Sequence, residues 1–277
     1  MPDHQIVLAI AGLTIRILDD APEIPLWLNS RCKPFHVDPA SAPQPSVTIA
    51  IHRDPLLDAG CDQLVVKAVG EPGGFWMHGV DFIVARKRCG LPFEVEAFPD
   101  AGMAGILRWI LGIALLEQGG LLLHAASCSI EGGGIAFPGP SGRGKTTLSR
   151  LLQPHFPVFT DETTALRFEG DIPLIYSTPF AGELGAIAGP VAAPLELLCF
   201  LRHASAMQAQ PMRLIDAAGQ LMGSLFMPLC HEPWLSATLA LVERVVRTVP
   251  CFDFGFCPTE EAVEVLNGLT RSAAAAA

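Results

Sequence analysis

Residues 139–146 read Gly-Pro-Ser-Gly-Arg-Gly-Lys-Thr and fit the pattern G-x-x-x-x-G-K-S/T, which is typical of loops that bind nucleotide phosphates. The apolar run over 134–137 precedes this loop, and leucines at helical spacing follow it until Pro154. The segment therefore predicts a strand, a phosphate-binding loop (P-loop) and a helix in direct succession. The alternative is a glycine-rich turn that fits the pattern by chance, and it leaves the flanking strand and helix unexplained.

The residue types of the loop suit nucleotide phosphates. Glycines let the backbone wrap closely, so that its N–H groups point at phosphate oxygens, and the N-terminus of the following helix adds positive potential. Lys145 is predicted to reach the β- and γ-phosphates, and the Thr146 hydroxyl to ligate Mg²⁺. We therefore predict ATP or GTP and Mg²⁺ as cofactors, with the nucleotide held by Gly139, Pro140, Ser141, Gly142, Arg143, Gly144, Lys145, Thr146 and Thr147.

A predicted hairpin brings a histidine to the loop. Residues 131–134 form a strong turn signal between two strand-like runs. With Gly132 and Gly133 in the turn, His124 lies opposite position 141, and a slip of one or two residues leaves it near the loop. The alternative interpretation of His124 is a structural histidine at the start of a strand.

An acidic pair follows the loop. Residues 156–168 read FPVFTDETTALRF, and the strand at their start is predicted to end at Asp161-Glu162. A carboxylate at the end of the next strand is where a P-loop protein holds Mg²⁺ or polarises a nucleophile. We predict a functional role for Asp161, with Glu162 assisting, against the alternative of a solvated turn carboxylate.

Together these motifs resemble the HPr kinase/phosphorylase family and its wider group of related proteins. That family has a histidine shortly before a G-x-x-G-x-G-K-S/T loop and an acidic pair at the end of the following strand. Here His124 precedes Gly139 at the family-like distance, and Asp161-Glu162 stands where the family has Asp-Asp. The resemblance implies a P-loop kinase core of the HPr kinase/phosphoenolpyruvate-carboxykinase-like type.

The resemblance also implies the chemistry of the site. Lys145 and the loop amides would hold the phosphates, Thr146 would bind Mg²⁺, and Asp161 would be the metal ligand or base with Glu162 helping. His124 would act near the transferred phosphate. The implied reaction is transfer of the γ-phosphoryl group of ATP to a serine or threonine hydroxyl of a protein or peptide.

Proteins of this group also occur in gene clusters for ribosomally made peptides, notably lasso peptides, so a precursor peptide is one candidate acceptor. The family tends to form hexamers, which implies a homo-oligomer. Residues 246–256 lack the arginines of the family's C-terminal catalytic segment, so phosphorylase activity is not implied. Two alternatives stay open: a small-molecule kinase on the same scaffold, and a nucleotide-binding regulatory or assembly protein with little turnover.

Three arginines are further candidates. Arg143 lies inside the loop and is placed to contact nucleotide or acceptor, against the alternative of a solvent-facing side chain. Arg202 and Arg213 flank a polar stretch and are candidates for neutralising transition-state charge, against the alternative of ordinary surface arginines.

The chain changes character along its length. Residues 1–100 are β-rich, with short β-branched or aromatic runs between Pro, Gly and Asp. Apolar residues at helical spacing predict a buried helix over 101–118, and strands and helices alternate after it. We predict an α/β fold with a P-loop kinase domain over 101–272 behind a β-rich N-terminal region. Residues 273–277 are an alanine run without an interpretable pattern.

Composition narrows the partners. Hydrophobic residues make up 50% of the chain, but charges or prolines interrupt every apolar stretch before the ~20 residues of a spanning helix. The first residues lack a basic region and a cleavage site, so a cytoplasmic protein without a membrane partner is predicted. The net charge of -10 argues against a nucleic-acid partner. The eight cysteines contain no C-x-x-C pair, which favours reduced and mostly buried thiols.

Overall fold

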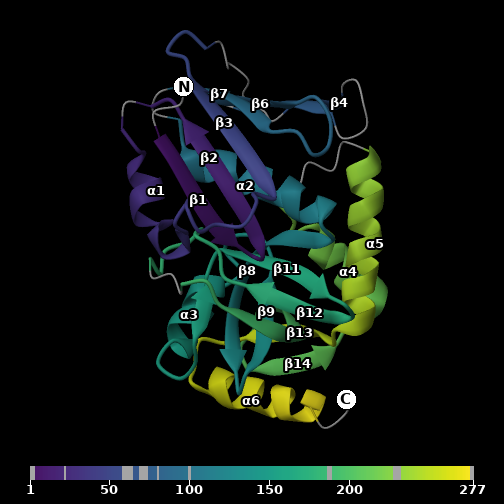
Figure 1. Ribbon diagram of the computed structural model, residues 1–277. Helices are drawn as coiled ribbons and strands as arrows, with labels where there is room; N and C mark the ends of the chain where they lie inside the picture. Colours follow the sequence, from purple (N-terminus) through teal and green to yellow (C-terminus); the bar gives the residue numbers. More distant parts are fainter. Residues whose placement is uncertain are drawn as a thin grey trace. The chain divides into compact units, whose positions relative to one another are not determined.

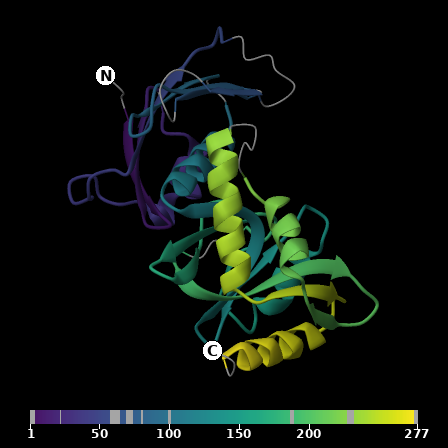
Figure 2. The same cartoon turned by 90° about the vertical axis from the view of Figure 1, so that its right-hand side faces the viewer.

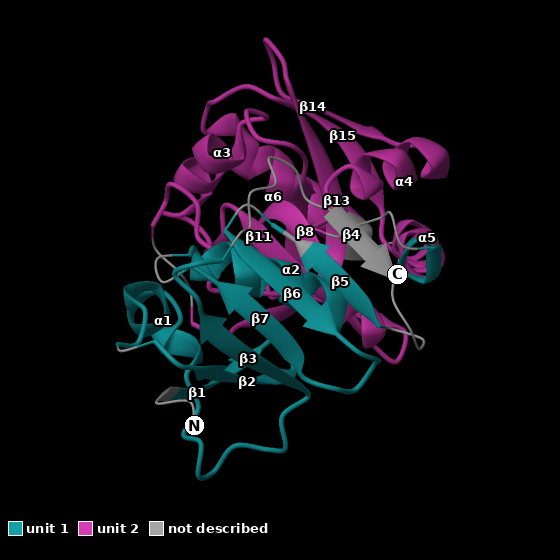
Figure 3. Cartoon of the chain, turned by 90° about the horizontal axis from the view of Figure 1, so that it is seen from above, with its two compact units in different colours: residues 1–114, 228–235 teal, residues 115–227, 236–277 magenta. Residues whose placement is uncertain are grey.

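The structure, a computed structural model, describes residues 4–21, 23–57, 65–68, 74–79, 81–98, 101–185, 189–226 and 232–274. These residues form two β-sheets and six α-helices (Figure 1), so the predicted α/β fold class is confirmed. The chain divides into two compact units, residues 1–114 with 228–235 and residues 115–227 with 236–277 (Figure 3). Among the described helices, none combines the length and the apolar character needed to cross a lipid bilayer.

The first unit is built on a seven-stranded sheet with the order β1-β2-β3-β7-β6-β5-β4. Apolar and polar residues alternate along its strands, as in the buried–exposed pattern of β7, and this alternation turns one face toward the core. Its elements are β1 His4–Ile10, β2 Leu13–Asp19, α1 Leu26–Ser30, the 3-10 helix η1 Lys33–Phe35, β3 Val47–Arg53, β4 Val65–Ala68, β5 Phe75–His78, β6 Phe82–Arg86 and β7 Phe93–Ala97.

The helix predicted over 101–118 is confirmed as α2, Met103–Glu117. The first unit includes this helix up to Ala114, whereas the sequence places the domain boundary at residue 100. Ile106, Leu107 and Ile110 are buried, and so is every residue from Leu111 to Leu116, whereas residues 104, 105, 108 and 109 are half-buried and Glu117 is exposed. The half-buried positions recur at helical spacing, so one face of α2 is less buried than the rest.

The second unit is built on an eight-stranded sheet. Its main path is β10-β8-β11-β12-β13-β15-β14, and β9 pairs with β8 and β13. Strands β9 and β15 run parallel to β13, whereas β8 and β9 form an antiparallel hairpin. The strands are β8 Gly120–Ile130, β9 Gly133–Pro138, β10 Val158–Thr160, β11 Thr163–Glu169, β12 Ile172–Tyr176, β13 Ala192–His203, β14 Gln208–Pro211 and β15 Cys251–Phe256.

Four helices complete this unit: α3 Lys145–Leu152, α4 Leu214–Met222, α5 Glu232–Thr248 (from residue 236) and α6 Glu261–Ala274. Helices α4 and α5 lie side by side (Figure 2) and line an apolar groove of about 540 Å³. Exposed Leu214, Ile215 and Leu239 border this groove. No partner is assigned to this groove, and the homo-oligomer expected from the sequence stays a prediction.

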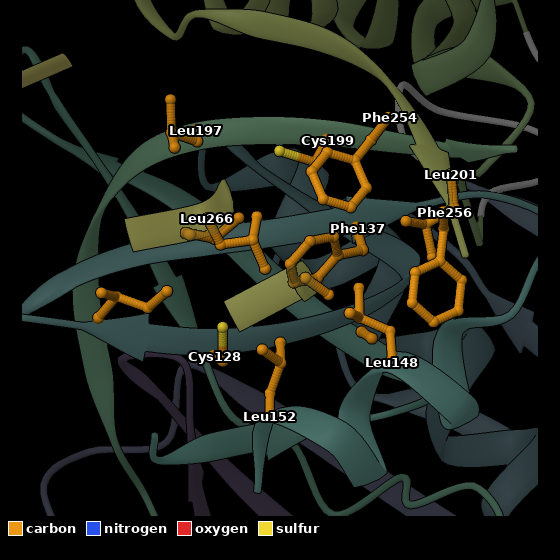
Figure 4. Packing of buried hydrophobic residues seen from close by; sticks show 14 residues of the cluster. Cys128, Phe137, Leu148, Leu152, Leu197, Cys199, Leu201, Phe254, Phe256 and Leu266 are labelled. Atoms are coloured by element: carbon orange, nitrogen blue, oxygen red, sulfur yellow. The ribbon is translucent and has the colours of Figure 1, made fainter. Parts of the chain in front are cut away.

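The core of the second unit fixes α3 against the sheet (Figure 4). Leu148 and Leu152 of α3 are buried with Phe137 of β9 and Phe254 of β15. Because α3 begins where the glycine-rich loop ends, this packing sets the direction in which the loop is presented. The cluster is completed by Ala126, Cys128, Ile130, Ile135, Leu197, Cys199, Leu201, Phe256, Ala262 and Leu266.

Most of the described cysteines are buried thiols, as predicted: Cys32, Cys128, Cys199 and Cys251, while Cys89 is exposed and Cys257 is half-buried. Burial raises the pKa of Cys128 and of Cys251 to about 12. Such thiols pack as small neutral hydrophobic groups. Cys61 and Cys230 lie outside the described residues.

The β8–β9 hairpin is present, and its register differs by two positions from the one expected with Gly132 and Gly133 in the turn, within the slip that the sequence left open. Ala125 pairs with Pro138, and the turn residues are Glu131 and Gly132, with φ of 51° and 93°. His124 therefore lies opposite Gly139 rather than position 141, and the Gly139 N–H donates to the His124 carbonyl at 3.1 Å.

The glycine run explains this difference. A Cβ on Gly133 would collide with the Glu196 carboxylate, and one on Gly134 would lie 2.7 Å from Ile175 Cδ1. Gly134 is needed where Ile175 and the Pro194 carbonyl approach the strand, whereas the Glu196 carboxylate beside Gly133 is the end of a flexible side chain. Both glycines belong to β9, and the turn falls one residue earlier than expected.

Candidate active site

The predicted strand–loop–helix segment is confirmed: β9 ends at Pro138, residues 139–144 form the loop, and α3 begins at Lys145. Gly142 and Gly144 have φ of 82° and 95°, in the left-handed region that favours glycine. A Cβ on Gly144 would lie 3.1 Å from the Phe256 ring, so space as well as conformation requires glycine there.

The Lys145 side chain is folded back over the loop. Its Nζ lies 2.7 Å from the Gly139 carbonyl oxygen, 2.9 Å from the Pro140 carbonyl oxygen and 2.8 Å from His124 Nε2. An ammonium group has three hydrogens, and here each has an acceptor. A phosphate oxygen can therefore join Lys145 only by replacing one of these acceptors.

Burial dominates the electrostatics of this lysine. The Lys145 side chain is 5% exposed, and its burial lowers the pKa of the ammonium group. The carboxylates of Glu162 and Asp161 act in the opposite direction and favour the charged form. The positive charge is thus held in a poorly solvated place, which strengthens its attraction for an anion, while the two nearby acids offset part of that charge.

His124 connects the loop to the acidic pair. Its backbone N–H donates to the Ser224 carbonyl at 2.6 Å. Its Nε2 accepts from Lys145, because an ammonium group can only donate, and this contact assigns the ring proton to Nδ1. Nδ1 lies 3.6 Å from Glu162 Oε1, and Ser141 Oγ lies 3.5 Å from Nε2.

Asp161 directly follows β10, at the strand end where the sequence predicted an acid. It is 2% exposed, and its Oδ2 accepts a hydrogen bond from Thr146 Oγ1 at 3.1 Å. The Gly182 N–H donates to Oδ1 at 2.9 Å, and the Leu184 N–H donates to Oδ2 at 3.1 Å. The two predicted magnesium ligands, Thr146 and Asp161, therefore lie next to each other.

A cleft of about 520 Å³ unites these groups. Its walls come from the loop, the start of α3, β8 and the segment after β10. All four residues predicted as catalytic line it: His124, Lys145, Asp161 and Glu162. Of the predicted loop residues, Ser141, Gly142, Gly144, Thr146 and Thr147 line the same cleft. Gly139, Pro140 and Arg143 instead line a neighbouring cavity.

His203 and Gly182 line this cleft and were not among the predicted site residues. His203 ends β13, and its Nε2 donates to the Gly142 carbonyl at 2.8 Å. Gly182 approaches Asp161 so closely that a Cβ would lie 2.7 Å from Oδ2. The sequence contained a usable signal for His203: the polar pair Arg202-His203 follows an apolar run and so marks the end of a strand. Ligand sites lie beyond the carboxyl ends of parallel strands.

Comparisons with known proteins add nothing to this geometry. No family model matches the chain, and no curated protein matches it significantly.

Proposed function

We propose that the chain is an ATP- and Mg²⁺-dependent kinase of the HPr kinase-like type, which transfers the γ-phosphoryl group to a serine or threonine hydroxyl of a protein or peptide. One observation carries the proposal: a P-loop lysine, a histidine and two acids meet in a single cleft. The P-loop pattern alone supports nucleotide binding, whereas the added acids and histidine support chemistry on the nucleotide.

In this proposal the loop amides and Lys145 hold the phosphates, and α3 presents its N-terminus to them. Thr146 and Asp161 suit Mg²⁺, because this ion takes one or two protein oxygens and completes its shell with phosphates and water. The bound ion would neutralise charge on the transferred phosphoryl group. ATP as cofactor and the buried thiols accord with the proposed cytoplasmic location.

The two acids take different parts in the proposed reaction. Asp161 accepts two backbone N–H groups and one hydroxyl, which hold its carboxylate in one orientation, and in this proposal it serves as the metal ligand. The Glu162 side chain is 29% exposed and lines the cleft, so it is placed to accept the proton of the acceptor hydroxyl. His124 holds Lys145 through Nε2, and its Nδ1 lies 3.6 Å from Glu162 Oε1, too far for a direct hydrogen bond in this structure.

The direct test is incubation with γ-labelled ATP, Mg²⁺ and a library of serine and threonine peptides. We expect Mg²⁺-dependent label on hydroxyl side chains, located by mass spectrometry. Bound ATP without transfer to any peptide would contradict the proposal, and so would label that appears only on small alcohols or sugars.

Replacing Gly182 by alanine should displace the Asp161 carboxylate, because the new Cβ has no room beside it. We expect the transfer rate to fall roughly 10- to 100-fold, as is common when a group that supports a metal ligand is changed. Gly268→Ala is the matched control, since a Cβ at this exposed position in α6 meets nothing within 4 Å. Equal rates in Gly182→Ala and Gly268→Ala would contradict the role given to Gly182.

A further inference from the structure

A second cavity, of about 630 Å³, borders the same loop. Gly139, Pro140 and Arg143 line it, whereas Ser141, Gly142 and Gly144 line the first cleft. The loop thus forms a wall between two cavities of similar size. The proposed phosphate chemistry uses only one of them.

The second cavity adjoins the γ-phosphate end of the loop. Lys145 Nζ, which in a P-loop reaches the β- and γ-phosphates, touches the carbonyl oxygens of Gly139 and Pro140 at 2.7 and 2.9 Å. These two residues line the second cavity. Thr147 and Arg150, further along α3, line only the first cleft. An acceptor that reaches the γ-phosphate can therefore extend over the loop into the second cavity.

Three arginines define the charge of this cavity: Arg143, Arg202 and Arg213 line it, against the two aspartates Asp216 and Asp253. In a chain with 28 acidic and 18 basic residues, such an excess of positive charge is a local feature. A cavity of this sign attracts an anionic group.

Two of the arginines are held in place by partners that line or adjoin the cavity. Arg202 Nε donates to Asp253 Oδ2 at 2.8 Å, and its Nη2 donates to Gln208 Oε1 at 3.0 Å. Arg213 makes a two-pronged contact with Asp216, at 2.6 and 2.9 Å.

Arg143 differs from the other two arginines. Within the described residues, its guanidinium has no hydrogen-bond or ion-pair partner, and it is the charge that the two aspartates leave uncompensated. Its side chain lies beside Gly139, where an added Cβ would lie 3.7 Å from Arg143 Cγ, so it stands at the same end of the loop as Gly139 and Pro140.

We propose that this cavity binds an acidic side chain of the phospho-acceptor, close in sequence to the hydroxyl that receives the phosphoryl group; this rests on the proposed kinase function. Guanidinium groups bind carboxylates through paired hydrogen bonds. An extended peptide advances about 3.3–3.6 Å per residue, so an acidic residue a few positions from the serine spans the loop. The amides of Gln210 and Gln220, also in the lining, are suited to the peptide backbone.

The test compares three labelled peptides in which the serine is flanked by aspartate, by asparagine or by lysine. Peptide affinity is measured by fluorescence anisotropy with ATP present, and transfer is measured separately. The aspartate peptide should bind roughly tenfold more tightly than the asparagine peptide, as expected for one charge-assisted contact. Arg143→Gln and Arg213→Gln should lose this preference.

Arg247→Gln is the matched control, because Arg247 is also an exposed arginine in a local ion pair, with Glu243 on α5. It should keep the preference for aspartate. Arg213→Glu provides a second variant at a position that tolerates substitution, since the Arg213 side chain is 80% exposed. It should shift the preference toward the lysine peptide.

The outcomes separate the two proposals. Equal affinity for all three peptides overturns the inference, even if all are phosphorylated and the kinase proposal stands. Selective binding of the aspartate peptide without transfer supports the cavity assignment and counts against the kinase. A parallel loss of ATP affinity in Arg213→Gln would place the nucleotide in this cavity and overturn the inference as well.

Discussion

Replacing Lys145 by methionine is expected to remove ATP binding and to lower phosphoryl transfer roughly 10²- to 10³-fold. The Nζ group is a buried positive charge beside Gly139, Pro140 and His124, and in the proposed function the loop presents it to the phosphates. In P-loop proteins such a lysine contacts the β- and γ-phosphates, and removing one preorganised charge donor typically costs roughly 10²–10³ in rate. The nucleotide-induced shift in melting temperature measures the loss.

The folded state should tolerate this change. Burial already disfavours the charged form of Lys145, as its lowered pKa indicates, and methionine is apolar and of similar length. Because the carbonyl oxygens of Gly139 and Pro140 lose their donor, we nevertheless expect a folded variant with a lower melting temperature without nucleotide than the unmodified chain. At about one hundred times its Kd, ATP should stabilise the unmodified chain by about 2.7 kcal/mol, and Lys145→Met should lose this gain.

The pH dependence of ATP affinity gives a second readout. Only the charged ammonium attracts phosphate, so affinity is full below the pKa of Lys145 and falls as the pH rises through it. Because burial lowers this pKa, the fall should begin at a lower pH than an exposed lysine would give. The fall of ATP affinity with rising pH should be absent in Lys145→Met. It should persist in Lys87→Met, which changes an exposed lysine. ATP affinity that survives in Lys145→Met would contradict the assignment of the loop.

Local patterns were enough to predict the parts of the site that depend on neighbouring residues. The strand, the glycine loop and α3 follow one another directly, so motif and periodicity identified them. Asp161 was found for the same reason, because the end of a short strand is a local feature. The exact hairpin register was not predicted, because three glycines in succession at 132–134 let the turn form at more than one place.

Contacts across the sheet could not be read from one sequence. His203 reaches the Gly142 carbonyl across 61 positions, because β13 lies parallel to β9. The arginines at 143, 202 and 213 were each recognisable as candidates, but their common cavity depends on where β13 and α4 lie. Such pairings are set by how strands and helices pack in three dimensions, which one-dimensional periodicity does not encode.

Replacing Asp161 by asparagine is expected to separate binding from chemistry. The asparagine side chain would keep the shape of the aspartate but lose the negative charge that suits Mg²⁺. We expect ATP binding without Mg²⁺ to persist, while Mg²⁺-dependent transfer falls roughly 10³-fold. Isothermal titration of ATP with and without Mg²⁺, next to transfer assays, measures both effects.

The hydrogen bonds of Asp161 require a control for this variant. Its two carboxylate oxygens accept the N–H groups of Gly182 and Leu184, and an asparagine offers only one oxygen, so one buried N–H loses its acceptor. That loss costs about 1–3 kcal/mol of stability. Glu162→Gln is the comparison, because the Glu162 side chain is 29% exposed and less stability should be lost there. A regulatory nucleotide-binding protein would keep its regulatory function in both variants. A kinase would lose phosphoryl transfer in both variants, and the Mg²⁺ dependence of its ATP affinity would be lost chiefly in Asp161→Asn.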